Sequence, residues 1–204
     1  LREHSRGEKS ETCWPRPEIH KRKHAGWILL ALCLVVYNVN LREYSGNDTT
    51  PNRYLPISLI KGHDLDLNEF SFLWGGAREN LPYFIQEGRG KILSSSPVLP
   101  GIINTPFYLI PGWKGLDPGD RNTVDLIAKF SASFWVACSA VIMLNIFLLY
   151  LEFRYALFLA LIYAFGTLTW AISSQAAWQH GPSELFLSLS LLFSLWILEG
   201  KTRW

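Results

Sequence analysis

The sequence predicts an all-α membrane protein: polytopic transmembrane helices with one large external loop that contains short interfacial (juxtamembrane) helices. Three observations predict this class. Charged residues gather near the start and in a central stretch, whereas the last third of the 204 residues is almost uncharged. Four apolar segments follow one another, and the Lys and Arg residues beside them agree on one orientation. A charge in the hydrocarbon core costs about 2.5–3.5 kcal/mol, so this segregation is typical of a membrane protein.

The first 41 residues contain a tail and one apolar segment. Residues 1–24 are polar and basic and end in "RPEIHKRKH", so we expect a mostly disordered cytoplasmic tail. Residues 25–41, "AGWILLALCLVVYNVNL", are predicted to form the first transmembrane helix, with Trp27 and Tyr37 at the interfaces. A basic region before an apolar one also fits a secretory signal peptide, but no small-residue cleavage pattern follows.

Residues 42–122 mix charges, glycines and prolines and are not expected to span a membrane. Within them, the apolar stretch "SSSPVLPGIINTPFYLIPGW" carries four prolines: Pro97, Pro100, Pro106 and Pro111. Each proline removes a backbone donor and disrupts a helix. We therefore expect an external loop with short interfacial or re-entrant helices, and a helix at "NRYLPISLI".

The rest of the chain alternates apolar segments with short connections. Transmembrane helices are predicted over residues 123–151, 155–172 and 185–198, with a short external loop at 173–184 and a cytoplasmic end at 199–204. Pro182 suits the first turn of the last helix, because a proline there loses no helical hydrogen bond.

The orientation follows from the basic residues near the segment ends. With four spans, the basic tail lies on the same side as Arg154, Lys201 and Arg203, and the loop 173–184 on the opposite side has no Lys or Arg. Because cytoplasmic loops are enriched in Lys and Arg, the N-terminus is predicted to be cytoplasmic, in a plasma (inner) membrane. The loops 42–122 and 173–184 are then both external, where they can meet.

The first candidate site follows the first apolar segment. Asp48 precedes Arg53 and Tyr54 by a few residues. A carboxylate at the membrane surface beside a cation can act as a general base or bind an acceptor hydroxyl. The string Asn-Asp-Thr-Thr is also typical of a turn and a helix N-cap, and the residues alone favour this structural interpretation.

Two further segments carry polar groups. In "EGRGKILSSSP", Arg89 and Lys91 could hold a phosphate, although their spacing alone favours an exposed basic turn. In "SQAAWQHGPSE", Gln179, His180 and Glu184 lie near the outer ends of two spans. Polar groups at that depth usually face a polar cavity, but a solvated loop with an interfacial tryptophan fits equally well.

Several functional classes find no support in the sequence. The net charge of +2 provides no basic surface for nucleic acid. There is no P-loop and no GxGxxG string, and His and Cys residues lack metal-binding spacing, so no cofactor or metal is indicated, although a divalent cation is compatible with the sequence. The three cysteines show no disulfide framework.

Taken together, the basic tail, the first span and three later strings resemble the N-terminal part of membrane glycosyltransferases of the GT-C class. The strings are "SGNDTTPNRYLPISLIKGHDLDLNEF", "GRGKILSSSPVLPGIINTPFYLIPG" and "TLTWAISSQAAWQHGPSELFLSLSLLF". The class includes protein mannosyltransferases and lipid A aminoarabinose transferases. The resemblance covers about residues 25–198 and implies that the chain is the first part of a longer enzyme.

The resemblance implies a hexosyl- or pentosyltransferase with a polyprenyl-phosphate sugar donor and an acceptor lipid, glycan or protein. Asp48 matches the first-loop aspartate that activates the acceptor, although Asn47 stands where a paired acidic residue is usual. The basic residues that would bind the donor phosphate are Arg53, Arg89 and Lys91. The residues that would support the cavity are Tyr54, Gln179, His180 and Glu184.

Two other classes compete with this interpretation. A transporter or lipid flippase also needs polar groups at mid-depth, but the apolar segments here are nearly free of charges and of Gly or Pro breaks. A non-catalytic membrane protein whose loop binds a partner is the second alternative. It predicts that loss of Asp48 changes little.

Overall fold

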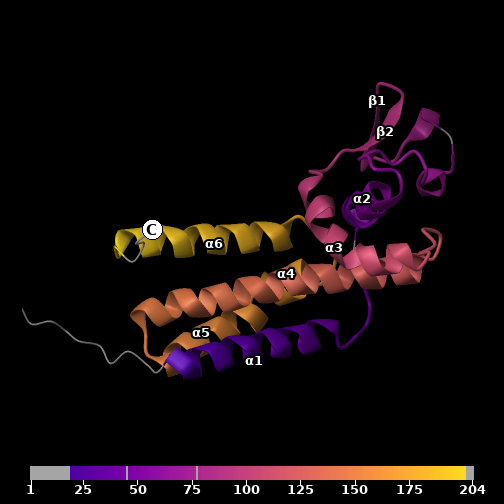
Figure 1. Ribbon diagram of the computed structural model, residues 1–204. Helices are drawn as coiled ribbons and strands as arrows, with labels where there is room; N and C mark the ends of the chain where they lie inside the picture. Colours follow the sequence, from indigo (N-terminus) through magenta and orange to yellow (C-terminus); the bar gives the residue numbers. More distant parts are fainter. Residues whose placement is uncertain (1–18, 45, 77, 201–204) are drawn as a thin grey trace, which may run out of the picture.

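The computed structural model describes residues 19–44, 46–76 and 78–200, and the chain in these ranges is mostly helical (Figure 1). Most of the predicted tail 1–24 lies outside the described residues, as do Lys201 and Arg203 of the predicted end 199–204. The described part divides into a bundle of long helices and a smaller unit, here called the cap, formed by residues 42–120 at one end of the bundle.

Four helices form the bundle. They are α1 (Ile19–Asn38), α4 (Arg121–Tyr150), α5 (Phe153–Phe165) and α6 (His180–Leu198). Helix α4 is the central element, because α1, α5 and α6 all pack against it. The chain reverses direction from each helix to the next, so that the turn between α4 and α5 lies at the end opposite the cap (Figure 1).

Small side chains let the bundle helices approach closely. Ala156, Ala160 and Ala164 recur at every fourth position of α5 and are fully buried against α1 and α4. At that spacing they lie on one face of the helix, where the absence of bulk brings backbones together. The buried Tyr37 hydroxyl of α1 donates to the Ala164 carbonyl oxygen at 3.0 Å, which fixes α1 beside α5.

Two of the helices, α4 and α6, are long and apolar enough to cross a membrane; the apolar parts of α1 (His24–Asn38) and α5 are shorter. The predicted segment 155–172 is not one helix. Helix α5 ends at Phe165, and a π-helical turn follows at Thr169–Ser173. The hydroxyl of Thr167 donates to the Tyr163 carbonyl oxygen and accepts from the Thr169 backbone N–H, so side-chain hydrogen bonds replace the helical pattern there.

The cap contains two helices, α2 (Thr50–Lys61) and α3 (Leu99–Trp113), and an antiparallel hairpin of β1 (Ile85–Gly88) and β2 (Lys91–Ser94). Short 3₁₀ turns lie at Asn47–Thr49, Ser71–Leu73 and Arg78–Asn80. The cap has a hydrophobic core of its own, which continues into the first turn of α4; its buried members are Tyr54, Leu55, Ile57, Leu67, Phe70, Phe84, Ile85, Ile92, Tyr108, Leu116 and Val124.

The prolines break α3 less than the sequence predicts. Instead of several short helices, the stretch forms one helix of 15 residues that keeps Pro106 and Pro111 inside it. Pro100 lies in the first turn, where no backbone donor is required. Each interior proline removes one hydrogen bond, and packing against α2 holds the helix together: a Cβ atom at Gly101 would lie only 2.8 Å from Cβ of Leu55.

The hairpin was not predicted. Its two-residue loop, Arg89 and Gly90, has φ angles of 54° and 75°. Two positive φ angles are typical of the type I′ turns that join antiparallel strands. The segment "EGRGK" is therefore a hairpin turn.

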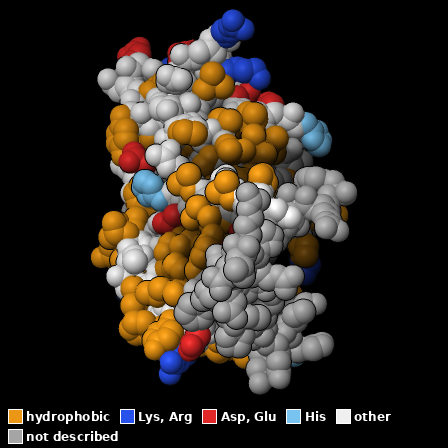
Figure 2. Space-filling model, turned by 90° about the vertical axis from the view of Figure 1, so that its left-hand side faces the viewer, with side chains coloured by type: hydrophobic (Ala, Val, Ile, Leu, Met, Phe, Trp, Pro, Cys, Tyr) orange, Lys and Arg blue, Asp and Glu red, His pale blue; other side chains and the backbone are white. Residues whose placement is uncertain are grey.

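The surface of the molecule divides in the same way as the chain. Figure 2 shows most of the visible Lys and Arg side chains toward the two ends of one face, and the part between them that is not grey is largely hydrophobic, with a few acidic and His side chains. Several large apolar side chains of the bundle are strongly exposed, among them Trp27 (72 %), Phe158 (60 %), Leu187 (71 %) and Leu198 (82 %). An exposed apolar surface of this kind requires a nonpolar partner, such as lipid or further protein.

Candidate functional site

The two loops that were predicted to be external lie against each other. The Tyr44 backbone N–H donates to the Gln175 carbonyl oxygen at 3.0 Å, and Asn52 Nδ2 donates to the Ala177 carbonyl oxygen at 3.0 Å. These bonds join residues more than 120 positions apart in the chain. They tie the start of α2 to the turn before α6.

A small polar pocket of about 120 Å³ lies where the loops meet. Its lining residues are Asp48, Asn52, Ser96, Trp178, Gln179 and His180. Asp48 comes from the turn before α2, and Gln179 and His180 come from the start of α6. The structure thus brings together three residues that the sequence singled out in separate segments.

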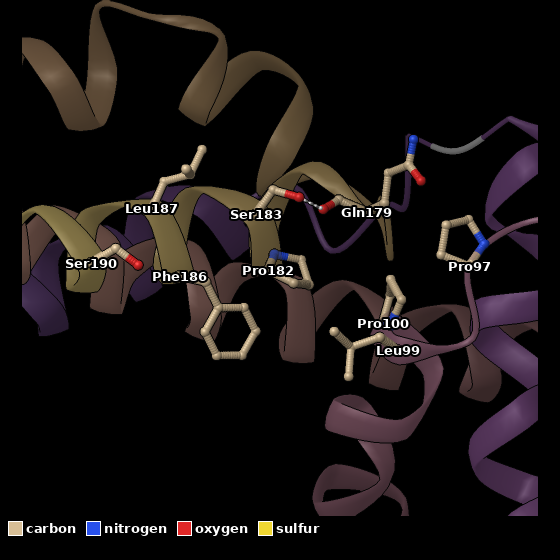
Figure 3. Close-up of a pocket in the computed structure, with 9 residues that line it drawn as sticks. All are labelled: Pro97, Leu99, Pro100, Gln179, Pro182, Ser183, Phe186, Leu187 and Ser190. Carbon is tan, nitrogen blue, oxygen red and sulfur yellow. Dashed lines mark hydrogen bonds between the residues drawn. The ribbon is translucent and has the colours of Figure 1, made fainter.

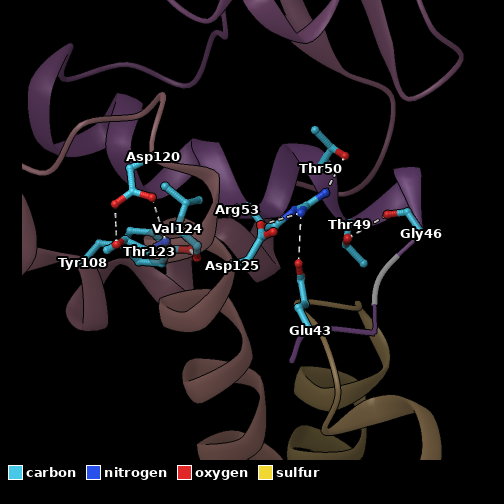
Figure 4. Close-up of polar contacts among 10 residues, drawn as sticks. All are labelled: Glu43, Gly46, Thr49, Thr50, Arg53, Tyr108, Asp120, Thr123, Val124 and Asp125. Carbon is cyan, nitrogen blue, oxygen red and sulfur yellow. Dashed lines mark hydrogen bonds and ion pairs between the residues drawn. The ribbon is translucent and has the colours of Figure 1, made fainter. Parts of the chain in front are cut away.

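Asp48 does not cap a helix. The turn hydrogen bond here comes from Thr49, whose hydroxyl donates to the Gly46 carbonyl oxygen at 2.8 Å (Figure 4), and Thr49 is also the N-cap residue of α2. The Asp48 side chain is exposed and has no ion pair within the described part of the chain. A hydrogen bond with Asp48 raises the pKa of the neighbouring Tyr83 phenol. The Asp48 carboxylate thus has an exposed phenol as a neighbour, and because it is itself exposed it can still contact a ligand.

Three residues that line the pocket were not among the predicted site residues: Asn52, Ser96 and Trp178. Asn52 and Trp178 both line it, and Asn52 Oδ1 and Trp178 Nε1 are buried without a hydrogen-bond partner among the described residues. The Trp178 ring is stacked on the imidazole of His180, with centroids 6.1 Å apart. Neither role is evident in the sequence, because Asn52 resembles a residue of a helix start and Trp178 an interfacial anchor.

Arg53 belongs to a different cluster, shown in Figure 4. Its Nη1 atom lies 2.9 Å from Glu43 Oε2 and 2.6 Å from Asp125 Oδ1, and its Nη2 atom donates to the Thr50 hydroxyl at 2.9 Å. Burial lowers the pKa of the guanidinium, but the two carboxylates more than offset this and raise it overall. Arg53 does not line the polar pocket. The Arg53 guanidinium on α2 therefore links the segment that follows α1 to the start of α4.

Tyr54 also points away from the pocket. It is 2 % exposed and packs against the rings of Phe70 and Phe72 in the cap core. Burial raises the pKa of its phenol. Tyr54 thus supports the cap as a hydrophobic residue.

Lys91 and Arg89 lie on the hairpin. Lys91 Nζ lies 2.5 Å from Asp66 Oδ2 and 3.8 Å from Asp64 Oδ2, and Arg89 is exposed at the turn. Neither residue lines the polar pocket. Carboxylate oxygens of Asp64, Asp66 and Glu69 lie within 4.8 Å of one another, but the Lys91 ammonium group already balances part of this charge.

Glu184 lies one turn beyond His180 on α6. Its Oε1 atom accepts a hydrogen bond from the Ser173 hydroxyl at 2.5 Å, and its Oε2 atom accepts from the Tyr163 hydroxyl at 3.4 Å. With His180 it lines a second hollow of about 270 Å³, which is otherwise mostly apolar. Glu184 therefore stands beside the polar pocket, with His180 between them.

Lys129 is a buried cation that the sequence placed in a span but not in the site. It is 1 % exposed, and its Nζ atom donates to Gln175 Oε1 at 2.8 Å. Gln175 begins the turn that carries Trp178. Lys129 thus helps to hold this turn against α4.

An apolar groove of about 420 Å³ runs from the polar pocket along α6 (Figure 3). Its walls are the start of α3, with Pro97, Leu99 and Pro100, and one face of α6; the α6 side consists of Gln179, Pro182, Ser183, Phe186, Leu187 and Ser190. Gln179 belongs to both the groove and the polar pocket. The polar pocket and the apolar groove are therefore neighbours that have one lining residue in common.

Comparison of the chain with models of protein families, with curated proteins and with solved structures gave no match.

Proposed function

We propose that the chain is part of an integral membrane glycosyltransferase that moves a sugar from a polyprenyl-phosphate donor to an acceptor at the external membrane face. One observation carries the proposal: the pocket that contains the Asp48 carboxylate shares Gln179 with an apolar groove along α6. A lipid-linked sugar is amphipathic. Its head requires hydrogen-bonding groups and its tail an apolar surface, and both lie side by side here.

The apolar helices support a membrane location. Helices α4 and α6 are long enough to cross the hydrocarbon core, which needs about 20 residues. The shorter α1 and α5 accompany them in the bundle, and most of the visible Lys and Arg side chains lie toward the ends of the face seen in Figure 2. In this arrangement the N-terminus is cytoplasmic, and the cap and the polar pocket lie at the outer surface of a plasma (inner) membrane.

The proposed reaction is an inverting displacement. Asp48 accepts the proton of an acceptor hydroxyl, whose oxygen forms a bond to the anomeric carbon of the donor sugar. The bond from that carbon to the donor phosphate oxygen breaks, and the polyprenyl phosphate leaves with the electron pair. Gln179 and His180 offer hydrogen bonds to the sugar or the acceptor in the same pocket. A correctly placed general base contributes about 10²- to 10⁴-fold to such a step.

The groups for the donor phosphate lie elsewhere. Arg53, Arg89 and Lys91 do not line the polar pocket, and two of them are engaged by carboxylates. In the proposed reaction Arg53 therefore stabilises the fold around Asp48. The phosphate would be held outside this pocket.

The test is transfer of radiolabelled sugar in membranes that contain the protein. Polyprenyl-phosphate sugars and nucleotide sugars are supplied in parallel, with membranes lacking the protein as the control. Transfer from a polyprenyl-phosphate sugar alone is the expected result. Absence of transfer from every lipid-linked donor, with folded protein in the membrane, would contradict the proposal.

A further inference from the structure

Two residues that line the polar pocket each carry a buried polar atom, one acceptor and one donor, that nothing in the described structure satisfies. Asn52 is 2 % exposed, and its Oδ1 atom has no partner, while Trp178 Nε1 is likewise buried and unbonded. A buried polar atom without a hydrogen bond costs about 1–3 kcal/mol. Two such atoms at the wall of one pocket are unusual in a folded protein, and a ligand that bonds to both would remove the cost.

The position of the Asn52 amide is fixed. Its Nδ2 atom donates to the Ala177 carbonyl oxygen, which can only accept. Turning the amide over would place two oxygen acceptors against each other. The free atom is therefore Oδ1, and it requires a donor.

The Trp178 ring is held from two sides. It stacks on His180, and its Cη2 atom lies so close to Gly46 that a Cβ atom there would be 3.0 Å away. The indole cannot turn far without displacing these neighbours. Its N–H group therefore stays beside the pocket and requires an acceptor.

The charge of the pocket limits the ligand. The lining residues include the Asp48 carboxylate and no Lys or Arg. Inorganic phosphate, which carries negative charge and mostly accepts hydrogen bonds, would meet Asp48 without a Lys or Arg to compensate. A hydroxyl group donates and accepts at the same time, so neighbouring hydroxyls can satisfy Asp48, Asn52 and Trp178 together.

We propose that Asn52 and Trp178 bind the hydroxyls of a neutral sugar ring, and that this pocket is a sugar subsite from which phosphate is excluded. Asn52 Oδ1 accepts from one hydroxyl and Trp178 Nε1 donates to another. The assignment of this sugar to a transfer reaction rests on the proposed function. The binding itself does not, and it is measured separately.

The experiment is a titration of the protein in lipid nanodiscs, without sugar-headed detergents, followed by saturation-transfer NMR. The probes are methyl glycosides of hexoses and pentoses and the matching sugar 1-phosphates. Inorganic phosphate, which has no carbon-bound proton to observe, is added as a competitor. We expect saturable binding of glycosides that inorganic phosphate does not displace. Tighter binding of the methyl glycoside identifies the acceptor as the source of the sugar, and tighter binding of the sugar 1-phosphate identifies the donor; both support the subsite.

Trp178→Phe keeps an aromatic ring but removes the N–H donor together with one of the two fused rings. We expect it to weaken glycoside binding about 5- to 10-fold, the loss of roughly one hydrogen bond. Trp135→Phe is the matched control, because Trp135 Nε1 already donates to Asn104 Oδ1 at 3.0 Å and does not line the pocket. The control should bind normally but lose more thermal stability than Trp178→Phe, because both changes remove one ring and only the control also breaks a hydrogen bond.

A second variant, Asn52→Ala, removes the unsatisfied acceptor, and its folding is checked by circular dichroism. It too should weaken binding. The subsite is overturned if folded wild-type protein binds no glycoside, if inorganic phosphate displaces the glycoside, or if both variants bind as tightly as wild type. Glycoside binding without any sugar transfer would contradict the proposed function and leave the subsite standing.

Discussion

Asp48 and Arg53 lie five positions apart on the same segment, yet their surroundings differ completely. Arg53 has 14 % of its side chain exposed and contacts two carboxylates, Glu43 and Asp125. Asp48 is exposed and lies in a pocket that no Lys or Arg lines. It shares this pocket with Asn52 and Trp178, whose buried polar atoms have no partner among the described residues. One charge is used to hold the protein together, and the other is left for a ligand.

The comparison teaches that residue type alone does not identify a functional charge. Buried ion pairs are costly to break, because removal of one partner leaves the other uncompensated. A charge that is already paired is therefore a poor ligand for a phosphate, whereas an unpaired carboxylate in a pocket can take part in proton transfer. The same difference separates Lys91, which is paired with Asp66, from Asp48.

The largest effect on stability is expected from Arg53→Met. The substitution leaves Glu43 and Asp125 without their cation and should lower the free energy of unfolding by about 3 kcal/mol, the usual range for a broken buried pair being 3–5 kcal/mol. Thermal unfolding in nanodiscs measures it. Arg78→Met is the matched control: its pair with Glu87 is about half exposed, so the loss should stay below about 1 kcal/mol. Equal losses of unfolding free energy in the two variants would contradict a larger stabilising role for Arg53 than for Arg78.

Gly46→Ala is expected to have the next largest effect. The new Cβ atom would lie 3.0 Å from Trp178 Cη2 and push the indole out of place, at a cost of about 1–2 kcal/mol. The backbone of Gly46, with φ of −107°, accepts an alanine without strain. Glycoside binding should fall together with stability. Gly26→Ala, where the contact to Val141 is an ordinary 3.4 Å, serves as the control: it should leave glycoside binding unchanged and, being inside α1, should not lower stability.

Lys91→Met tests the paired cation of the hairpin. Burial raises the pKa of Asp66, but hydrogen bonds from Lys91 and the Asn68 backbone N–H outweigh it and lower the pKa below its ordinary value. A carboxyl group with a lowered pKa in the folded state stabilises the fold above its unfolded pKa of about 3.9, and this contribution disappears as the pH falls through the folded pKa. The variant should therefore be less stable than wild type at neutral pH, and the difference should shrink below about pH 4. Chemical unfolding between pH 3 and 7 measures this. If the variant instead lost sugar transfer at unchanged stability, Lys91 would be a donor-binding residue.

The smallest effect is expected from Arg89→Gly. Arg89 has a left-handed backbone, with φ of 54°, which glycine adopts more easily. The variant should be as stable as wild type or more stable by up to about 1 kcal/mol, with unchanged sugar transfer. A clear fall in transfer would show that the hairpin turn contributes to donor binding.

Part of this molecule could be predicted from the sequence. Apolar helices are visible in a sequence as continuous runs of apolar residues, and α1, α4, α5 and α6 therefore overlap the predicted segments. The meeting of the two loops could also be predicted, because the basic residues put both on one side.

The rest depended on contacts between distant residues. Glu43 and Asp125 lie 10 and 72 positions from Arg53, so no local pattern reveals that its charge is paired. The orientation of the Asn52 amide, which leaves its oxygen unsatisfied, depends on a hydrogen bond to Ala177, 125 positions away. The glycine at position 90 was compatible with a phosphate loop or a turn, and the pairing of β1 with β2 decides for the turn.

The measurement that tests the central claim most directly is the rate of sugar transfer by Asp48→Asn beside Asp117→Asn. Asp117 is an exposed carboxylate of the cap whose Oδ1 atom accepts from the Gly119 backbone N–H, a bond that asparagine can also make. We predict that Asp48→Asn remains folded and loses at least about 100-fold in rate, while Asp117→Asn transfers as wild type. Transfer by Asp48→Asn at the wild-type rate would show that the polar pocket does not carry the chemistry.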